Sequence, residues 1–463
     1  MTTSAHGFQI INPADGECVR IHERIEAAEA AARIEAAHEA WLDWRHTSWS
    51  TRRAVIMTLA DLLDAQQDKL AARCTMEMGK PISESRAEIE KCAWVCRYYA
   101  EHAEAMLSGH LIPLDKSTAH LMHAPIGVLY AVMPWNFPFW QVFRAAAPQL
   151  MAGNAMVLKH APNTMGCGAD ITDLFRHTDA PSGLFSDLPI DIADSPKVIR
   201  HPHVRGVTLT GSERAGRAVA AEAGAQLKKC VMELGGSDPY IVLEDADLEL
   251  AVDRCVRSRM LNCGQVCIAA KRLIVVDEMY DQFRDAVRDR MAAIKMQDPM
   301  QPDAQLGPMA RQDLRHSLHA HIQHSLDAGA SLSLGGVCPD RPGWWYPPTM
   351  LEDVQPGMPA FDEEIFGPVA CLVRATDQAQ AIALAGKTRF GLAAAVFTQD
   401  LDRGHRLADD ALDVGSVALN DLVKSDPRVP FGGTRSSGFG RELGLSGIHE
   451  FVNLKSVVIP TST

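Results

Sequence analysis

The sequence predicts an α/β fold, in which parallel sheets are covered by helices on both faces. Between residues 127 and 419, short apolar runs with strand character alternate with helical stretches. The chain has 463 residues, too many for one ordinary compact core, so two or three domains are expected. Its hydrophobic fraction of 47% and charged fraction of 22% are those of a globular protein.

The first elements expected are helices, from Trp44 to about Leu107. Apolar residues recur there at helical spacing, first at Val55, Leu59, Leu62 and Leu63. A second such run extends from Glu88 to Met106, and the charged residues between the apolar positions are typical of solvated faces.

Strands are expected next, in two series. They cover residues 127–133, 155–159, 204–210, 240–243, 272–276, 371–373, 393–398 and 416–419. The two series predict two α/β domains that divide near Gly235–Gly236.

Two segments do not fit this alternation. Ser108–Pro125 is polar and turn-rich and stands just before a strand. Phe451–Pro460 is a terminal strand-like run after two complete domains, and a lone strand is unstable without a partner. An arm exchanged within an oligomer would supply that partner.

Charge and composition exclude several classes of partner. The formal net charge is −13, so the chain should not bind nucleic acid, and an anionic substrate must be held by local arginines. The N-terminal residues contain no cationic stretch before a long apolar run, so neither a signal peptide nor a membrane span is expected. Eleven scattered cysteines indicate reduced thiols in a cytoplasmic protein. Cys92 with Cys96 and Cys263 with Cys267 could each be a metal pair, but neither has a second Cys/His pair at structural-zinc spacing nearby, so no metal is expected.

Three short segments carry candidate chemistry. In the sequence NCGQVC (262–267), Cys267 lies in a turn, and a single cysteine is more often a buried hydrophobe than a nucleophile. Glu233 stands before a Gly-Gly turn, where a glutamate is more often a solvated surface acid. Asn136 lies in PWNFP (134–138), whose two prolines fix a turn and leave its amide as a rigid donor or a simple turn former.

Taken together and in this order, these segments resemble the aldehyde dehydrogenase superfamily over nearly the whole chain. The matching segments are PWNFP (134–138), VLK (157–159), LTGSERAG (209–216), ELGG (233–236), GQVC (264–267), EEIFGPV (363–369), PFGG (430–433) and GFGRE (438–442). Within the superfamily the chain is most similar to succinate semialdehyde dehydrogenases, through LKHAPN (158–163), residues 228–252 and GQVCIAAKR (264–272).

The resemblance implies two Rossmann-like α/β domains and a small β oligomerisation arm. The cofactor-binding domain is expected at residues 1–107 and 127–234, the catalytic domain at 235–448, and the arm at 108–126 and 449–463. It also implies a homodimer or homotetramer that exchanges a C-terminal strand between its subunits.

Catalytic roles follow from the same resemblance. The Cys267 thiolate is expected to add to the aldehyde carbon, while the Asn136 amide and the Cys267 backbone N–H bind the oxyanion. Hydride transfer to the nicotinamide then leaves a thioester. Glu233 is expected to act as general base for the thiol and for the water that hydrolyses the thioester.

Cofactor contacts are implied at nine positions. They are Pro134, Trp135, Lys159, Pro162, Gly211, Ser212, Gly216, Glu364 and Phe366. The loop 211–216 is neither GxGxxG nor a P-loop, but between a strand and a helix its Ser212 and backbone N–H groups can hold pyrophosphate. Lys159 is expected at the adenosine ribose and Glu364 at the nicotinamide ribose. The alternative to cofactor binding is that Lys159 is a solvated lysine at a strand end and Phe366 a core phenylalanine.

The choice between NAD and NADP depends on Pro162. Many NAD-specific relatives carry a glutamate three residues after the ribose-binding lysine, and that acid repels the 2′-phosphate of NADP. Pro162 carries no charge, so both cofactors should be accepted. Lys159, assisted by a protonated His160, would pair with the phosphate, and Asn163 could still bond a ribose hydroxyl.

The expected substrate is succinate semialdehyde or another small carboxylated aldehyde. Arg144, which follows Asn136 by eight residues, resembles a carboxylate-binding arginine of the subfamily. Arg259 precedes Cys267 by eight residues in a shifted register, and Ser425 could donate a third hydrogen bond. The alternative is that these are surface arginines and a loop serine.

Other functions remain open on the sequence alone. A CoA-acylating or broad-specificity aldehyde dehydrogenase has similar motifs, and a non-enzymatic binding protein would not need Cys267, Glu233 and Asn136 together. Cys263 stands where threonine is common. Some relatives carry a second cysteine two residues after the nucleophile, but Ala269 occupies that position here, so a regulatory disulfide is not expected.

Overall fold

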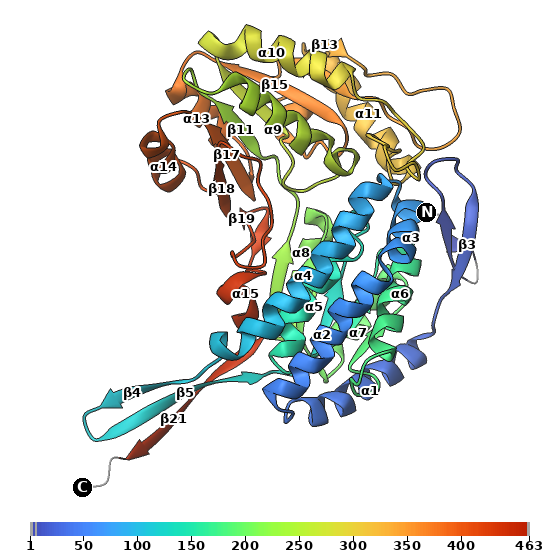
Figure 1. Ribbon diagram of the computed structural model, residues 1–463, viewed down its shortest axis with the longest axis vertical. Coiled ribbons are helices and arrows are strands. Elements are labelled where there is room, and N and C mark those ends of the chain that lie inside the picture. Colours follow the sequence, from blue (N-terminus) through green and yellow to red (C-terminus); the bar gives the residue numbers. More distant parts are fainter. Residues whose placement is uncertain (1–2, 5–6, 461–463) are drawn as a thin grey trace.

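The computed structural model describes residues 3–4 and 7–460 (Figure 1). Two large sheets, each covered by helices, lie one above the other, and a three-stranded sheet projects from the lower one. Within the described residues, every helix is too short or too polar to cross a membrane.

The N-terminal part consists of a small antiparallel sheet and four helices. The sheet contains β1 (Thr3–Ser4), β2 (Gly7–Ile11) and β3 (Cys18–Glu23). The helices are α1 (Ala27–Trp44), α2 (Trp49–Ala65), α3 (Gln67–Met78) and α4 (Ile82–Met106). All four helices bury an apolar face, although the sequence analysis expected helices only from Trp44 and so missed α1. The helices α2, α3 and α4 lie side by side over the lower sheet (Figure 1).

The lower sheet has six strands in the order β20-β10-β9-β6-β7-β8. They are β6 (Val128–Val132), β7 (Ala155–Lys159), β8 (Phe185–Asp187), β9 (Val204–Thr210), β10 (Lys229–Glu233) and β20 (Gly438–Phe439). All pairs are parallel except that of β20 with β10. Its connecting helices are α5 (Trp140–Met151), α6 (Met165–Arg176), α7 (Ser195–Arg200) and α8 (Glu213–Ala225).

The upper sheet has seven strands in the order β13-β14-β15-β12-β11-β17-β18. They are β11 (Pro239–Val242), β12 (Arg272–Val276), β13 (Ser331–Leu334), β14 (Thr349–Glu352), β15 (Val369–Ala375), β17 (Ala393–Phe397) and β18 (Ser416–Leu419). Only the β13–β14 pair is antiparallel. Its helices are α9 (Leu248–Met260), α10 (Asp277–Ala292), α11 (Gln312–Asp327), α12 (Pro359–Asp362), α13 (Gln378–Gly386) and α14 (Leu401–Asp410).

The α/β fold expected from the sequence is confirmed. Each of the expected strands between residues 127 and 419 is present within two residues of its expected ends. The predicted boundary near Gly235–Gly236 falls between β10 and β11, but β20 returns from the later part of the chain to the lower sheet. The exact domain boundaries therefore stay a prediction.

The projecting sheet consists of β4 (His110–Leu114), β5 (Ser117–Pro125) and β21 (Val452–Pro460). These are the two segments that did not fit the α/β alternation. The partner that the C-terminal strand needs lies in its own chain, because β21 pairs with β5 from Val452↔Pro125 to Pro460↔Ser117. Exchange of the arm between subunits stays a prediction. Residues 461–463 of the predicted arm lie outside the described residues.

Candidate active site

Four of the predicted segments meet at one edge of the lower sheet. Glu233 and Lys159 are the last residues of β10 and β7, Gly211 directly follows β9, and Pro134–Asn136 follow β6. Because these strands are adjacent and parallel, their carboxyl ends lie side by side. The connections reverse direction between β6 and β9, and ligands of open α/β sheets bind at this kind of switch point.

The Cys267 loop is shaped by an unusual backbone. It follows α9, and Asn262, Cys263 and Gly264 have φ values of 54°, 56° and 73° in succession. A Cβ on Gly264 would lie 2.1 Å from the carbonyl oxygen of Gly367. The left-handed turn therefore requires glycine at position 264. It also holds the loop tightly against Gly367, just before β15.

Hydrogen bonds join this loop to the Asn136 turn. The Asn136 Nδ2 donates to the carbonyl oxygen of Gln265 at 3.0 Å, two residues before Cys267. The Asn262 Nδ2 donates to the carbonyl oxygens of Asn136 at 2.8 Å and Gln265 at 3.1 Å. The predicted nucleophile and the predicted amide donor are thus held on one shared network, and a second Asn136 N–H is available for a ligand.

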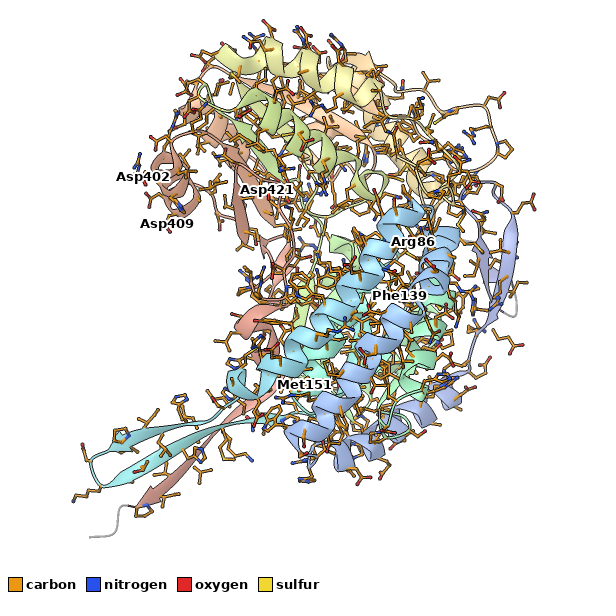
Figure 2. All side chains as sticks on the ribbon, in the orientation of Figure 1. Arg86, Phe139, Met151, Asp402, Asp409 and Asp421 are labelled. Carbon is orange, nitrogen blue, oxygen red and sulfur yellow. The ribbon has the colours of Figure 1, made fainter. Side chains whose placement is uncertain are left out.

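A buried ion pair supports the same turn, and the sequence analysis missed it. Lys80 and Glu88 pair inside the protein, where both side chains are at most 1% exposed. The Lys80 Nζ also donates to the Asn136 carbonyl oxygen at 3.3 Å, and Glu88 accepts from the backbone N–H groups of Phe139 and Trp140, both at 2.8 Å. Phe139, labelled in Figure 2, directly precedes α5. The only sequence feature that could have indicated this ion pair is the charged residue Glu88 on a face of α4 that is otherwise buried.

The Cys267 thiol lies in a largely desolvated site. Burial raises the pKa of Cys267 to about 11, although Lys271 and Arg144 act in the opposite direction. The Lys271 Nζ also donates to the Cys267 carbonyl oxygen, which helps to fix the loop. At neutral pH the thiol is therefore protonated in this structure, and it needs a base to become a nucleophile.

Glu233 is buried without the partners that would stabilise its charge. Within the described residues, neither of its carboxyl oxygens has a hydrogen-bond partner. Burial raises the pKa of Glu233 well above its ordinary value, and the Glu442 carboxylate adds to this effect. A Cβ on Gly432 would lie 2.7 Å from Glu233 Oε1, so the carboxyl group rests against a glycine that leaves room for it.

The predicted nicotinamide-side residues are also brought together. Trp135 and Phe366 pack edge to face with their ring centroids 5.7 Å apart. Glu364 Oε1 accepts from the Gly236 N–H at 3.1 Å and lies 3.3 Å from the Lys271 Nζ. A Cβ on Gly235 would lie 2.2 Å from Glu364 Oε2, which explains why the Gly-Gly turn admits this carboxylate.

The predicted phosphate loop begins helix α8. The Ser212 Oγ caps the helix by accepting from the Ala215 N–H at 3.3 Å, and the Gly211 N–H donates to the Glu233 carbonyl oxygen at 2.9 Å. Gly216 packs against Leu234, whose side chain would lie 2.5 Å from a Cβ at this position. The loop is therefore fixed to the Glu233 segment.

Lys159 and His160 differ in whether their side chains are free to bind a ligand. Among the described residues, the buried Lys159 Nζ has a single hydrogen-bond partner, the His160 carbonyl oxygen at 3.5 Å, and burial lowers the pKa of Lys159 to about 8. The expected assistance from a protonated His160 is wrong. Its ring bonds the Pro138 carbonyl oxygen, the Ala161 N–H and the Thr164 hydroxyl, each at 2.8 Å, and burial lowers its pKa to about 4.

A cavity of about 500 Å³ opens beside Cys267. Its wall includes Arg144 and Ser425, two of the three predicted substrate-binding residues. Arg144 is ion-paired with Glu442 and donates to the Thr210 Oγ1 at 3.2 Å. Arg259 does not line the cavity, because its guanidinium is fully buried and donates to the Gly264 carbonyl oxygen. This position outside the cavity agrees with the sequence, in which Arg259 stands in a shifted register relative to Cys267.

These features define a class of enzyme. A Rossmann-like sheet with a ligand-binding edge, and a cysteine between it and a second α/β unit, are the architecture of a nucleotide-dependent dehydrogenase with a thiol at its centre. The chain belongs to the aldehyde dehydrogenase family, whose family model matches residues 1–457.

Known proteins with high similarity agree with this assignment. The chain is 44% identical to the succinate semialdehyde dehydrogenase [NAD(P)+] Sad of Escherichia coli (strain K12), over 99% of this chain and 98% of that protein. It is 43% identical to the succinate-semialdehyde dehydrogenase [NADP(+)] of Deinococcus radiodurans, over 97% and 94%. The crystal structure of succinic semialdehyde dehydrogenase from Streptococcus pyogenes with NADP+ has a TM-score of 0.96 and 34% identity, covering 98% of this chain and all of that one (100%).

Proposed function

We propose that this enzyme oxidises succinate semialdehyde, or a similar small carboxylated aldehyde, to the acid with NAD+ or NADP+. The observation that carries the proposal is the cavity in which Cys267 faces the same space as basic residues and Ser425. The named activities of the relatives from Escherichia coli and Deinococcus radiodurans support the same substrate.

Cys267, Asn136 and Glu233 are proposed to perform the chemistry. Glu233 takes the proton of the Cys267 thiol and passes it to solvent, and the thiolate forms a C–S bond to the aldehyde carbon, whose carbonyl oxygen becomes an oxyanion. The free Asn136 N–H and the Cys267 backbone N–H are proposed to bind that oxygen, each donor contributing about 3 kcal/mol. After hydride loss, Glu233 takes a proton from water, and the hydroxide cleaves the thioester to release the acid and the thiol. The raised pKa of Glu233 makes it a stronger base than an ordinary carboxylate.

The residues at the sheet edge fit a nicotinamide dinucleotide. The buried Lys159 ammonium lacks a counter-ion among the described residues, which suits a ribose hydroxyl or a 2′-phosphate. Ser212 and the α8 N-terminus suit the pyrophosphate, and Glu364 suits the second ribose. Pro134, Trp135, Pro162 and Phe366 are proposed to complete the site. When bound, the dinucleotide accepts the hydride.

The carboxylated end of the substrate is proposed to lie against the Arg144 and Ser425 side of the cavity. Water, not CoA, is proposed as the acyl acceptor, because Glu233 provides a buried base for it. A CoA-acylating enzyme and a non-enzymatic binding protein are both disfavoured, because Cys267, Glu233 and Asn136 are all present and the relatives are named as succinate semialdehyde dehydrogenases.

The assembly and location belong to the same proposal. We infer a homodimer or homotetramer, because the projecting sheet exposes apolar side chains that include Leu111, Leu454 and Val458. A cytoplasmic location is supported by the eleven cysteines, all of which are free thiols.

A panel of aldehydes, assayed for NADH and NADPH formation with and without CoA, tests the proposed function. We expect succinate semialdehyde to have the highest kcat/KM of the panel, with both cofactors used and no requirement for CoA. If a neutral aldehyde is oxidised equally well, the carboxylated substrate is wrong. If product forms only with CoA, the hydrolytic step is wrong.

A further inference from the structure

Lys91 is a basic residue in the wall of the Cys267 cavity to which the proposed function assigns no role. Lys91 lies on α4, the helix that covers the lower sheet and approaches the upper one (Figure 1). Figure 2 shows Arg86, one and a half turns earlier on the same helix, at the end of α4 near the upper sheet. Lys91 is therefore delivered to the cavity by a rigid element, not by a loop.

The contacts of Lys91 are all with uncharged groups. Its Nζ donates to the Ser425 Oγ at 2.8 Å and lies 4.3 Å from the centre of the Trp140 ring. Across residues 3–4 and 7–460, Lys91 takes part in none of the ion pairs, and the Asp426 and Glu88 carboxylates act on it only from a distance. A half-buried cation without a counter-ion is unfavourable by itself, and a bound anion would remove that cost.

The other basic residues near the cavity are differently placed. Arg144 is 2% exposed and its charge is already neutralised by Glu442, while its guanidinium lies 4.7 Å from the centre of the Phe431 ring. Arg257 and Lys424 also line the cavity, but both are exposed to solvent, and Lys424 pairs with Asp421 at 2.7 Å. Lys91 therefore combines burial, an unpaired charge and a hydroxyl group already beside it.

We propose that Lys91, together with the Ser425 hydroxyl, binds the carboxylate of the substrate and sets the enzyme's preference for carboxylated aldehydes. This inference rests on the proposed function and names the residue that reads the substrate. In the structure the Ser425 Oγ accepts from Lys91. With substrate bound, the Lys91 ammonium donates to one carboxylate oxygen, and the Ser425 O–H turns to donate to the other. Arg144 remains the partner of Glu442.

The site should be sensitive to alkaline pH. Burial, assisted by nearby Arg144 and opposed by Cys92, Asp426 and Glu88, lowers the pKa of Lys91 to about 8. The ammonium is present below this pKa and is lost above it. The KM for a carboxylated aldehyde should thus rise above about pH 8, while the KM for a neutral aldehyde should not follow.

The test compares succinate semialdehyde with butanal, a neutral aldehyde of equal chain length, in the wild type and in Lys91→Met. Methionine keeps the length of the side chain against Trp140 but removes the charge. We expect kcat/KM for succinate semialdehyde to fall about 10- to 100-fold, mainly through KM, because one charge-assisted hydrogen bond is lost. The kcat/KM for butanal should stay the same or rise, and Lys91→Arg should restore part of the preference.

Two further variants separate charge loss from position. Arg97→Met removes a charge from the solvent face of α4, where Arg97 pairs with Asp61 and Asp64, and should leave both substrates unaffected. Arg257→Gln removes the exposed charge of the same cavity. A selective loss in Arg257→Gln instead of Lys91→Met would overturn the proposal, as would equal losses for both aldehydes in Lys91→Met.

Calorimetric titration with succinate distinguishes this proposal from the proposed function. We expect succinate to bind the wild type and to bind Lys91→Met about 10- to 100-fold more weakly. Equal binding to both proteins would overturn the Lys91 assignment even if the enzyme oxidises succinate semialdehyde. Lys91-dependent binding without aldehyde oxidation would instead reject the proposed reaction and retain the carboxylate site.

Discussion

The environment of the nucleophile determines how its reactivity should depend on pH. Because burial raises the pKa of Cys267 to about 11, only a small fraction is thiolate at neutral pH. Alkylation of the free enzyme by iodoacetamide, followed at the Cys267 peptide by mass spectrometry, should accelerate about tenfold per pH unit between pH 7 and 10. The exposed thiol of Cys18 provides an internal reference for reagent quality. A rate that is already constant below pH 8 would contradict the account.

Glu442 offers a test of how the proposed base is tuned. Its carboxylate raises the pKa of Glu233 and pairs with Arg144, so Glu442→Gln removes a negative charge and leaves the arginine uncompensated. Both changes favour ionised Glu233. The low-pH limb of kcat/KM, where Glu233 becomes protonated and inactive, should therefore move to lower pH.

The same substitution should be costly for the fold. A buried arginine that loses its counter-ion destabilises a protein by about 3–5 kcal/mol, which urea unfolding can measure. The conservative Glu442→Asp keeps the charge and should keep the pH profile. A Glu442→Gln profile that moves to higher pH would show that Glu442 does not raise the pKa of Glu233.

Residues with a motif could be predicted from the sequence, whereas residues that act from helices could not. Asn136 and Cys267 stand in short segments that resemble a family, and the structure brings these two segments together. Glu88 and Lys91 occupy positions of α4 whose charges look like a solvated face, and Lys80 lies in the short connection between α3 and α4. Their burial depends on packing between segments far apart in the chain, which no local pattern records.

At the scale of elements, the connection after β7 decides the cofactor prediction. Lys159 ends the strand and Pro162 begins the short 3-10 helix η1 (Pro162–Thr164). Pro162→Glu would place a negative charge three residues after the lysine, which should shift the ratio of kcat/KM toward NAD by about tenfold or more. Pro162→Gln is the neutral control of equal size. An unchanged ratio in Pro162→Glu would show that this position does not face the adenosine ribose.

Strands were predictable where they are buried on both faces. β6, β7 and β12 are continuous runs of buried apolar residues, which is the pattern of a central parallel strand. β10 begins with the polar residues Lys229 and Cys230 and was not expected, although it carries Glu233 to the site. The left-handed turn at residues 262–264 was also not expected, since Asn262 and Cys263 are not glycine.

At the scale of the whole molecule, the projecting sheet makes a prediction about assembly. Leu111, Leu454, Val458 and Ile459 are all more than half exposed on it, and such a patch is unfavourable in an isolated monomer. Sedimentation at micromolar concentration should give a dimer or tetramer of the 50.5 kDa chain. Leu454→Glu with Val458→Glu should shift it toward smaller species, since burying two charges opposes association.

Sedimentation of the wild type as a monomer would contradict the predicted dimer or tetramer. The sequence predicted the projecting segments because they interrupt the α/β alternation. It could not show that β21 pairs with β5 of its own chain, because strand pairing depends on where the chain returns in space.

The central claim for the molecule is that aldehyde oxidation proceeds through a covalent bond to Cys267. It is tested most directly by NADPH formation from succinate semialdehyde, without CoA, in Cys267→Ala and in the wild type. We predict that kcat falls by at least about 10⁴-fold while cofactor binding, followed by fluorescence, persists. Cys263→Ser, which changes the neighbouring buried thiol, should retain turnover. Full steady-state turnover by Cys267→Ala would contradict the account.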